Sequence, residues 1–391
     1  MVINKPTRGR GKTPVASGSQ VEVACKALLR LIWTNGLRAG DRLPTHWELC
    51  EKIGVSNNSL APAMRRLVEA GVIARKTKAG TVVVDPNAFA EPLWRVGVAE
   101  NFENLRSASP YFSLLCACVQ NELVRTGCWP RLYLRRVSTD RPADALGDYP
   151  ELSSDAESGL LDGAIALGSL SREGWDRATG AAPLCGFSEA ASCGALIDMR
   201  GVIREAVRVL AGRGCERIEV VRKSGHPAER VIRKGFREGI AAAGLPKRAL
   251  VEPSSAWSHS AVIPGTLTHM LAGGREAQVL LGLPAKRRPD GLVVTDDYMA
   301  AGLTSVLREA GGYRPRIAVI THLQAPQIYA LPVLRFELDI AELAQRGVAI
   351  LMERLRNPGL PDRVDWVAPR LLALREQEFP DVGRYGAEPG P

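Results

Sequence analysis

Long apolar runs are missing from this chain of 391 residues. No stretch approaches the ~18 consecutive apolar residues that a membrane-spanning helix needs. A secretory signal is excluded as well, because Lys26 and Arg30 interrupt the apolar residues between Val23 and Trp33. We therefore expect a cytoplasmic protein that does not enter a membrane.

Cysteine pairs of the CxxC type are also absent. The eight cysteines lie mostly within runs of apolar or small residues, where a thiol behaves as a small buried side chain. Cys116 and Cys118 lack the further His or Cys neighbours that a zinc site needs. The sequence thus predicts reduced thiols and no metal site.

Motifs of several enzyme classes are missing too. There is no G-x-S-x-G nucleophile elbow, no Walker loop and no HExxH pair, and the five histidines are scattered. The few lysines in the later part of the chain lie in polar segments, which is unlike the buried Schiff-base lysine of an aminotransferase-like domain. We expect neither a catalytic activity nor a cofactor.

Positive charge is present, and it is concentrated at one end. Residues 1–86 contain 14 Lys and Arg against 6 Asp and Glu, a net charge of +8, whereas the other 305 residues carry 37 against 36. Such asymmetry is typical of a polyanion-binding module attached to a neutral one. A solvated basic face is the plainer alternative.

The basic segment has the pattern of three helices followed by a β-hairpin. Thr45 and Glu48 form a capping-box pattern at the start of the second helix, and a Gly-containing turn leads into the third, whose polar residues lie apart from its apolar face. The expected elements are helices over 21–32 and 46–53, a third helix after Gly54, and strands over 71–76 and 81–84.

Pro62 complicates the third helix. If Ser56 is the cap, Pro62 lies in the helix interior and removes a backbone hydrogen bond; if Ser59 is the cap, Pro62 lies in the first turn, where that bond is absent anyway. We favour the second arrangement, in which the regular helix starts late.

The basic segment resembles the winged helix-turn-helix of GntR-type bacterial transcription regulators. The resemblance rests on Leu43-Pro44-Thr45, Glu48-Leu49, Gly54-Val55-Ser56, Leu67, Gly71-Val72-Ile73 and Gly80-Thr81-Val82-Val83. It implies that the third helix enters the major groove of double-stranded DNA while nearby Lys and Arg neutralise phosphates. The DNA-binding residues that it implies are Thr45, Ser56, Asn57, Asn58, Ser59, Arg65, Arg66, Lys76, Lys78, Gly80 and Thr81.

The longer second part of the chain alternates strand-like apolar runs with helical patterns, which indicates βαβ units and parallel sheets. We expect strands over 95–98, 132–137, 163–167, 217–221, 292–295 and 317–320, and helices over 111–124, 202–210, 228–243, 299–309 and 342–355. The length suits two Rossmann-like lobes, so the predicted fold class is α/β with an N-terminal α+β domain. The expected organisation is a disordered basic arm (1–20), a winged helix-turn-helix (21–86), a linker (87–93), a two-lobed domain (94–374) and a tail (375–391).

Loops of this second part are similar to the effector domain of LacI/GalR-type regulators, which is related to periplasmic sugar-binding proteins. The segments that carry the resemblance are Pro110-Tyr111-Phe112, Ile197-Asp198, Gly212 to Ile218, Arg230 with Gly235-Phe236, Pro289 to Asp297, and Pro332-Val333-Leu334. The resemblance implies a small-molecule effector, expected to be a sugar, bound between the lobes by Tyr111, Phe112, Arg230, Asp296 and His322. Asp297 is expected to cap the following helix.

Together the two resemblances imply a transcription regulator, expected to be a repressor, with a layout similar to arabinose-responsive repressors of some bacteria. A homodimer would bind an inverted-repeat operator. Two alternatives stay open. His322 and Ile232 stand where the LacI/GalR family usually has Asp and Arg, so the sensor domain could respond to a partner protein or to nothing. The other alternative is an enzyme fused to a DNA-binding domain.

Overall fold

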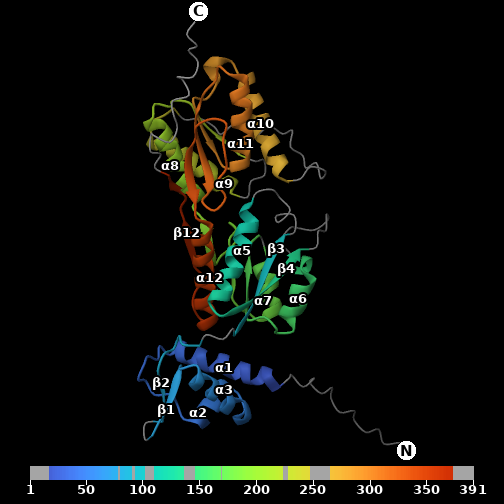
Figure 1. Ribbon diagram of the computed structural model, residues 1–391, viewed down its shortest axis with the longest axis vertical. Coiled ribbons are helices and arrows are strands. Elements are labelled where there is room, and N and C mark those ends of the chain that lie inside the picture. Colours follow the sequence, from blue (N-terminus) through green and yellow to red (C-terminus); the bar gives the residue numbers. More distant parts are fainter. Residues whose placement is uncertain are drawn as a thin grey trace, which may run out of the picture. The chain divides into compact units, whose positions relative to one another are not determined.

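The computed structural model describes most of the chain (Figure 1), with residues 17–77, 80–89, 93–101, 110–135, 146–168, 170–222, 228–246 and 265–372 described. Most of the expected basic arm and all of the expected tail over 375–391 lie outside these ranges. Two compact units are present, one made of residues up to Trp94 with 127–129 and 353–360, the other of the remainder. No helix within the described ranges is long and apolar enough to cross a membrane.

The first unit contains the three helices and the hairpin that the sequence predicts. Its elements are α1 (Ser17–Thr34), α2 (His46–Ile53), α3 (Asn57–Glu69), β1 (Ile73–Lys76) and β2 (Gly80–Val83). Leu28, Leu49, Leu60 and Leu67 are fully buried where the helices meet. Each such leucine contributes about 2 kcal/mol through its removal from water, so this small core depends on the apolar face of every helix.

The late start expected for α3 is wrong. The helix begins at Asn57, and the Ser56 hydroxyl accepts a hydrogen bond from the backbone N–H of Ser59 at 3.3 Å. An early start places Leu60 on the buried face in register with Leu67, which explains why the helix forms in spite of Pro62. Pro62 therefore lies inside the helix and cannot donate a hydrogen bond to the carbonyl of Asn58.

The second unit contains two lobes, each built on a mainly parallel sheet. The sheet of the first lobe has the order β12-β7-β6-β5-β3-β4, and that of the second lobe has the order β13-β11-β10-β9-β8. The first lobe contains β3 (Trp94–Asn101), α5 (Pro110–Arg125), β4 (Cys128–Arg135), α6 (Pro150–Glu157), β5 (Gly163–Ala166), α7 (Arg172–Thr179), β6 (Leu184–Gly186), β7 (Gly194–Ile197) and β12 (Val364–Val367). The expected two-lobed α/β architecture is confirmed.

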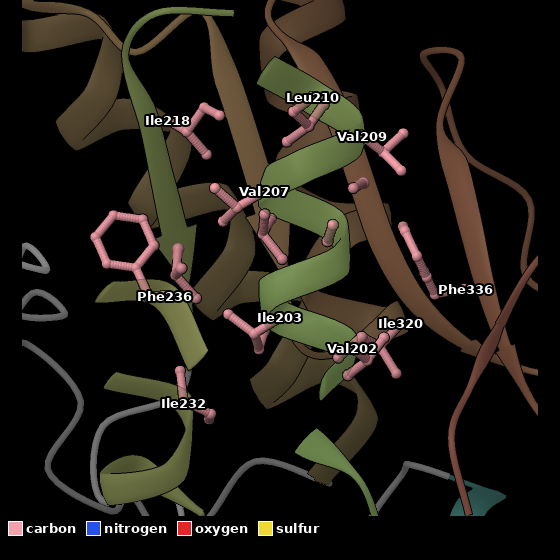
Figure 2. Packing of buried hydrophobic residues seen from close by; sticks show 14 of the residues in the cluster. Val202, Ile203, Val207, Val209, Leu210, Ile218, Ile232, Phe236, Ile320 and Phe336 are labelled. Carbon is pink, nitrogen blue, oxygen red and sulfur yellow. The ribbon is translucent and has the colours of Figure 1, made fainter. Parts of the chain in front are cut away.

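The second lobe has a three-layer core. It contains α8 (Met199–Gly212), β8 (Ile218–Val221), α9 (Glu229–Ala242), α10 (Gly265–Gly282), β9 (Gly291–Val294), α11 (Asp297–Ala310), β10 (Arg316–His322), β11 (Leu334–Leu338) and β13 (Arg370–Leu371). Figure 2 shows Val207 of α8 directed toward Phe236 of α9, and Val202 near Ile320 of the sheet. Ile232 is fully buried in the same cluster, so it packs the core and is not available to a ligand.

Helices α10 and α11 pack on one another with almost no space between their backbones. A Cβ atom added at Gly273 would lie 1.9 Å from the carbonyl oxygen of Met299, and one added at Gly302 would lie 1.9 Å from the carbonyl oxygen of Met270. Only glycine fits at either position. This contact fixes the N-terminal half of α11, which follows directly on β9.

The chain passes between the two lobes three times. Asp198 follows β7 and caps α8, and Asp339 follows β11 and accepts hydrogen bonds from the first backbone N–H groups of α12 (Ile340–Arg356). The third passage lies between β12, which pairs with β7, and β13, which pairs with β11. The carboxyl ends of both sheets therefore connect directly to the segments that join the lobes.

Candidate DNA-binding surface and effector site

Thr45 acts first as a helix cap. Its hydroxyl accepts from the backbone N–H of Glu48, and the Glu48 carboxylate accepts from the backbone N–H of Thr45 at 2.7 Å and from its hydroxyl at 2.8 Å. These two hydrogen bonds from Thr45 lower the pKa of Glu48, with the charges of Lys52 and Arg42 helping. The predicted capping box is confirmed, and it sets where α2 begins.

The two serines predicted to bind DNA are oriented differently. Ser56 is exposed and caps α3, whereas Ser59 is only 8% exposed, and the two hydroxyls lie 3.0 Å apart. The Ser59 side chain thus points toward the cap of its own helix. Of the pair, Ser56 is the residue that presents polar atoms to solvent.

Asn57, Asn58 and Arg65 are exposed on α3, as a helix that enters a groove requires. Arg66 differs from them because its guanidinium lies over the ring of Phe89, 5.8 Å from the centroid. Of the two arginines of α3, Arg65 therefore extends into solvent and Arg66 packs on Phe89.

His46 and Trp47 were not predicted as part of this surface. His46 Nε2 is hydrogen-bonded to Asn57 Oδ1, so the first residue of α2 orients the first side chain of α3. Trp47 is 80% exposed beside it. With Nε2 as the donor, Asn57 keeps its amide N–H groups available to acceptors on a base edge. The only sequence signal for this contact is that His46 and Asn57 are the first residues of the two helices of the helix-turn-helix.

The β-hairpin has an antiparallel register in which Lys76 faces Gly80. Gly80 has φ +78°, and a Cβ there would lie 3.1 Å from Nε of Arg42. The backbone of Arg42 also forms an antiparallel β-bridge with Val82 of β2, so an arginine from the segment before α2 lies beside the basic hairpin. Lys76 is exposed and Thr81 half-buried, while the predicted contact Lys78 lies outside the described residues.

In the second unit, Asp296 lies between β9 and α11. Its carboxylate accepts from the backbone N–H of Met299 and is 2.8 Å from His269 Nδ1 on α10. Burial acts to raise the pKa of Asp296, but the His269 hydrogen bond and charge, the Met299 N–H and the charge of His322 outweigh it and lower that pKa. An ionised carboxylate is thereby held at the carboxyl end of β9.

The capping role expected for Asp297 is wrong, because α11 starts one residue earlier than that role requires. Asp296 is the cap, and Asp297 is the first residue of the helix, only 1% exposed. The Asp297 carboxylate is 3.0 Å from Nδ1 of His322 at the end of β10. Two adjacent carboxylates are thus each paired with a histidine from a different element.

Tyr111 connects this cluster to the first lobe. It lies near the start of α5, which follows β3, and its ring centroid is 5.4 Å from that of His322 and 5.0 Å from that of Phe112. Burial, together with the nearby charge of Glu100, raises the pKa of Tyr111. Four of the five predicted effector residues, Tyr111, Phe112, Asp296 and His322, therefore lie in one group of linked side chains that includes both lobes.

Arg230 is the exception. It is exposed in the first turn of α9, and the described contacts of the cluster do not include it. Arg222, at the carboxyl end of β8, is instead buried and makes two hydrogen bonds to Glu229, at 2.6 and 2.8 Å. Arg230, which the LacI/GalR resemblance placed in the effector cleft, therefore lies apart from the cluster in the structure. Arg222 directly follows β8, at the carboxyl end of the sheet.

Comparison with known families matches the two parts separately. Residues 20–83 match the model of the bacterial regulatory proteins of the gntR family, and residues 207–375 match that of the periplasmic binding protein-like domain. The chain joins a GntR-type head to a periplasmic-binding-protein-like domain. The GntR-type head covers α1 to β2, and the second match begins inside α8.

Among known proteins, an uncharacterised HTH-type transcriptional regulator of Bacillus subtilis (strain 168), YcbG, is 43% identical over 58 residues, which are 15% of this chain. The chain spans only a quarter of the length of that relative. The similarity therefore concerns the GntR-type head alone.

Solved structures show the fold of the rest. A LacI family transcriptional regulator from Enterococcus faecium, determined with bound ribose, has a TM-score of 0.53 at 17% identity and covers 71% of this chain and 96% of its own. The lac repressor dimer bound to operator and an anti-inducer has a TM-score of 0.55 at 16% identity, covering 71% and 92%. At these identities the likeness establishes a LacI-type fold.

Proposed function

We propose that this chain is a DNA-binding transcription regulator in which the GntR-type head binds an operator and the two-lobed domain binds a small-molecule effector. The observation that carries the proposal is the exposed start of α3. There Asn57 is oriented by His46, while Asn58 and Arg65 extend into solvent in a head of net charge +8. No catalytic role is part of the proposal.

DNA recognition by this head would combine two kinds of contact. Amide side chains at the start of α3 can make hydrogen bonds to base edges in the major groove, where every base pair presents a distinct pattern. Arg65, Lys76 and Arg42 supply charge for phosphates and make the affinity dependent on salt. Base contacts would then depend mainly on asparagine, and affinity on the surrounding cations.

The test is binding of the full-length protein to fragments of its own genome, followed by fluorescence anisotropy on the fragments selected. Asn57→Ala and Asn58→Ala should reduce the preference for the selected fragment over random DNA. Asn35→Ala is the matched control, because the Asn35 side chain is also exposed but donates to the carbonyl of Leu31 in the preceding helix α1. Equal binding to all fragments at every salt concentration would overturn the proposal.

For the effector, we infer a neutral polyhydroxylated molecule of the sugar class held by the cluster at the carboxyl ends of both sheets. Carboxylates such as Asp296 accept from hydroxyl groups, and the ring of Tyr111 offers a face on which a sugar can stack. The Enterococcus faecium regulator of the same fold was solved with bound ribose, which puts sugars first among the candidates.

A thermal-shift screen with sugars and nucleosides tests this assignment. A true effector stabilises the folded state by mass action, by about 2.7 kcal/mol at a hundred times its Kd. Asp296→Asn should abolish the shift, while Asp176→Asn should keep it, because Asp176 pairs with Arg172 on α7. A shift that survives in the Asp296 variant would place the ligand elsewhere.

We further propose a homodimer that represses transcription from an inverted-repeat operator. Support comes from the fold, which it shares with the lac repressor, a protein solved as a dimer on its operator. A ligand would act by binding one arrangement of the two lobes more tightly than the other, which shifts their populations. Sedimentation of the protein and footprinting on a selected fragment would test the dimer and the two-fold site, and reporter transcription with and without the protein would test repression.

One observation favours a second candidate, a sensor domain that takes no small molecule. Tyr111 and His322 already contact one another, and His322 is already bound to Asp297, so the polar groups of the cluster satisfy each other. A screen without any stabilising compound, alongside intact DNA binding, would favour this candidate.

A further inference from the structure

Two buried thiols of the first lobe lie side by side. Cys185 in β6 and Cys193 just before β7 are 1% and 2% exposed, and their Sγ atoms are 3.6 Å apart. A disulfide bond is about 2.05 Å long, so the two sulfur atoms need to approach by roughly 1.5 Å to form one. All eight cysteines of the chain are in the thiol form.

The backbone fixes this proximity. Gly186 pairs with Gly194 in parallel register, and the cysteines are the residues immediately before them on neighbouring strands. Gly194 has φ +140°, and a Cβ there would lie 2.0 Å from the carbonyl oxygen of Gly186, so only glycine allows the two chains to come this close. Neighbouring strands lie about 4.8 Å apart, within the range of Cα separations that disulfides span. The thiols can therefore join by rotation of their side chains.

A small cavity lies beside the two thiols. A cavity of about 30 Å³ borders both cysteines and is also lined by Gly168, Ser188 and Ser192. A cavity of ~10–15 Å³ holds one water molecule, so this one has room for a molecule with two oxygen atoms. Hydrogen peroxide has that size.

We propose that Cys185 and Cys193 form an oxidation site that hydrogen peroxide converts into a reversible disulfide. One thiol, as its thiolate, attacks the peroxide; its sulfur is oxidised to sulfenic acid while the O–O bond breaks and one water is released. The second thiol attacks that sulfur, the S–S bond forms, and a second water leaves. In total, two thiols and one peroxide give one disulfide and two waters, and a dithiol reductant reverses the change.

A disulfide at this site would also restrain the segments that lead from the first lobe to the second. The bond joins β6 to the start of β7, and β7 leads at its other end to Asp198, where the chain crosses to the second lobe. Ser192, next to Cys193, donates to Asp362 just before β12, another strand that leads to a crossing. Oxidation thus constrains the first-lobe end of two of the three connections between lobes.

Peptide mapping of the full-length protein tests the site, because both cysteines lie in one tryptic peptide, residues 178–200, with no Lys or Arg between them. The folded protein is treated with hydrogen peroxide, quenched with an alkylating agent under denaturing conditions, and digested. We expect this peptide to become mainly unalkylated and lighter by two hydrogen atoms, and dithiothreitol treatment before alkylation should restore both alkylated cysteines.

Two variants serve as controls. Cys193→Ser should remove the cross-link and leave Cys185 alkylated or singly oxidised. Cys215→Ser should change nothing, because Cys215 is as buried as Cys193 but its Sγ faces the carbonyl oxygen of Asp290 at 3.5 Å. Half-buried Cys50 reports that the oxidant was active. Consumption of Cys50 while Cys185 and Cys193 remain fully alkylated would overturn the proposal.

Discussion

The substitution Pro62→Ala tests whether α3 is one continuous helix that begins at Asn57. Pro62 lies in the sixth position of a helix that begins at Asn57, so it has no N–H to offer the carbonyl of Asn58. Alanine restores that donor without adding bulk. We expect the substitution to stabilise the GntR-type head, which is unusual for a change in a half-buried residue.

The magnitude follows from three contributions. Proline is about 3 kcal/mol less favourable than alanine in a helix interior. The variant loses about 0.4–1 kcal/mol because its unfolded chain is freer. It loses roughly 1 kcal/mol more because part of the half-buried proline ring no longer packs. The net expectation is a gain of about 1–2 kcal/mol, or several degrees in the melting temperature of a unit of this size.

Hydrogen exchange of the full-length protein, followed by mass spectrometry on peptides from 57–69, reads the change where it occurs. Pro150→Ala is the matched control, because Pro150 occupies the first turn of α6, where no helical hydrogen bond is lost. Slower exchange in α3 of the first variant, and unchanged or faster exchange in α6 of the second, is the expected result. If Pro62→Ala leaves exchange in α3 unchanged or speeds it, the continuous helix is refuted.

Three further predictions concern packing, charge and pH. Gly302→Ala should destabilise the second unit by about 1–3 kcal/mol, since its Cβ would lie 1.9 Å from a backbone oxygen, whereas Gly282→Ala, with nothing within 4 Å, should leave the melting temperature unchanged. Arg65→Ala should reduce the slope of log affinity for DNA against log salt by about 0.9 if Arg65 contacts one phosphate, and an unchanged slope would show that it contacts none. The pKa of Asp296 is lowered in the folded state, mainly by His269, so its contribution is complete above the unfolded value of about 3.9 and is lost as the pH falls through the folded value. Wild-type melting temperatures should therefore fall more steeply below about pH 4 than those of Asp296→Asn, and parallel curves would contradict this.

The sequence predicts α2 of the GntR-type head to the residue because its signals are local, whereas α1 begins at Ser17, inside the arm expected to be disordered. The capping box of Thr45 with Glu48 and the left-handed Gly54 limit α2 at both ends, and the structure places the helix between them. The Pro62 expectation failed because burial of Leu60, a tertiary effect, outweighed the local preference of proline for a first turn.

Helix α10 was not predicted at all. Its 18 residues include glycines at 273 and 274, which weaken any helical expectation, and Met270, Leu271 and Val279 remain exposed, so its apolar residues do not form a single buried stripe. The glycines have a purpose only in the presence of α11, on which the helix packs. The reason why glycine is required in α10 is therefore found in α11 and not in the sequence of α10 itself.

For the candidate effector site, the sequence likewise predicted the positions of the loops better than the roles of the residues in them. Alternation of strands and helices predicted which loops gather at the carboxyl ends of the sheets, and Tyr111, Asp296 and His322 do lie there together. Roles within the loops depended on where a helix begins to within one residue, and the structure moves the helix cap from Asp297 to Asp296. The bond from His46 to Asn57 joins residues of two helices, so only the three-dimensional structure reveals it.

The three passages of the chain between the lobes make neither lobe a continuous piece of sequence. No exchange of one continuous segment can replace a single lobe, since β12 belongs to the sheet of the first lobe although it follows most of the second lobe in the sequence. A protease that cuts at Asp198 alone would leave the lobes joined by the other two connections. The GntR-type head is therefore one continuous stretch of the chain, whereas each lobe depends on segments that lie far apart in the sequence.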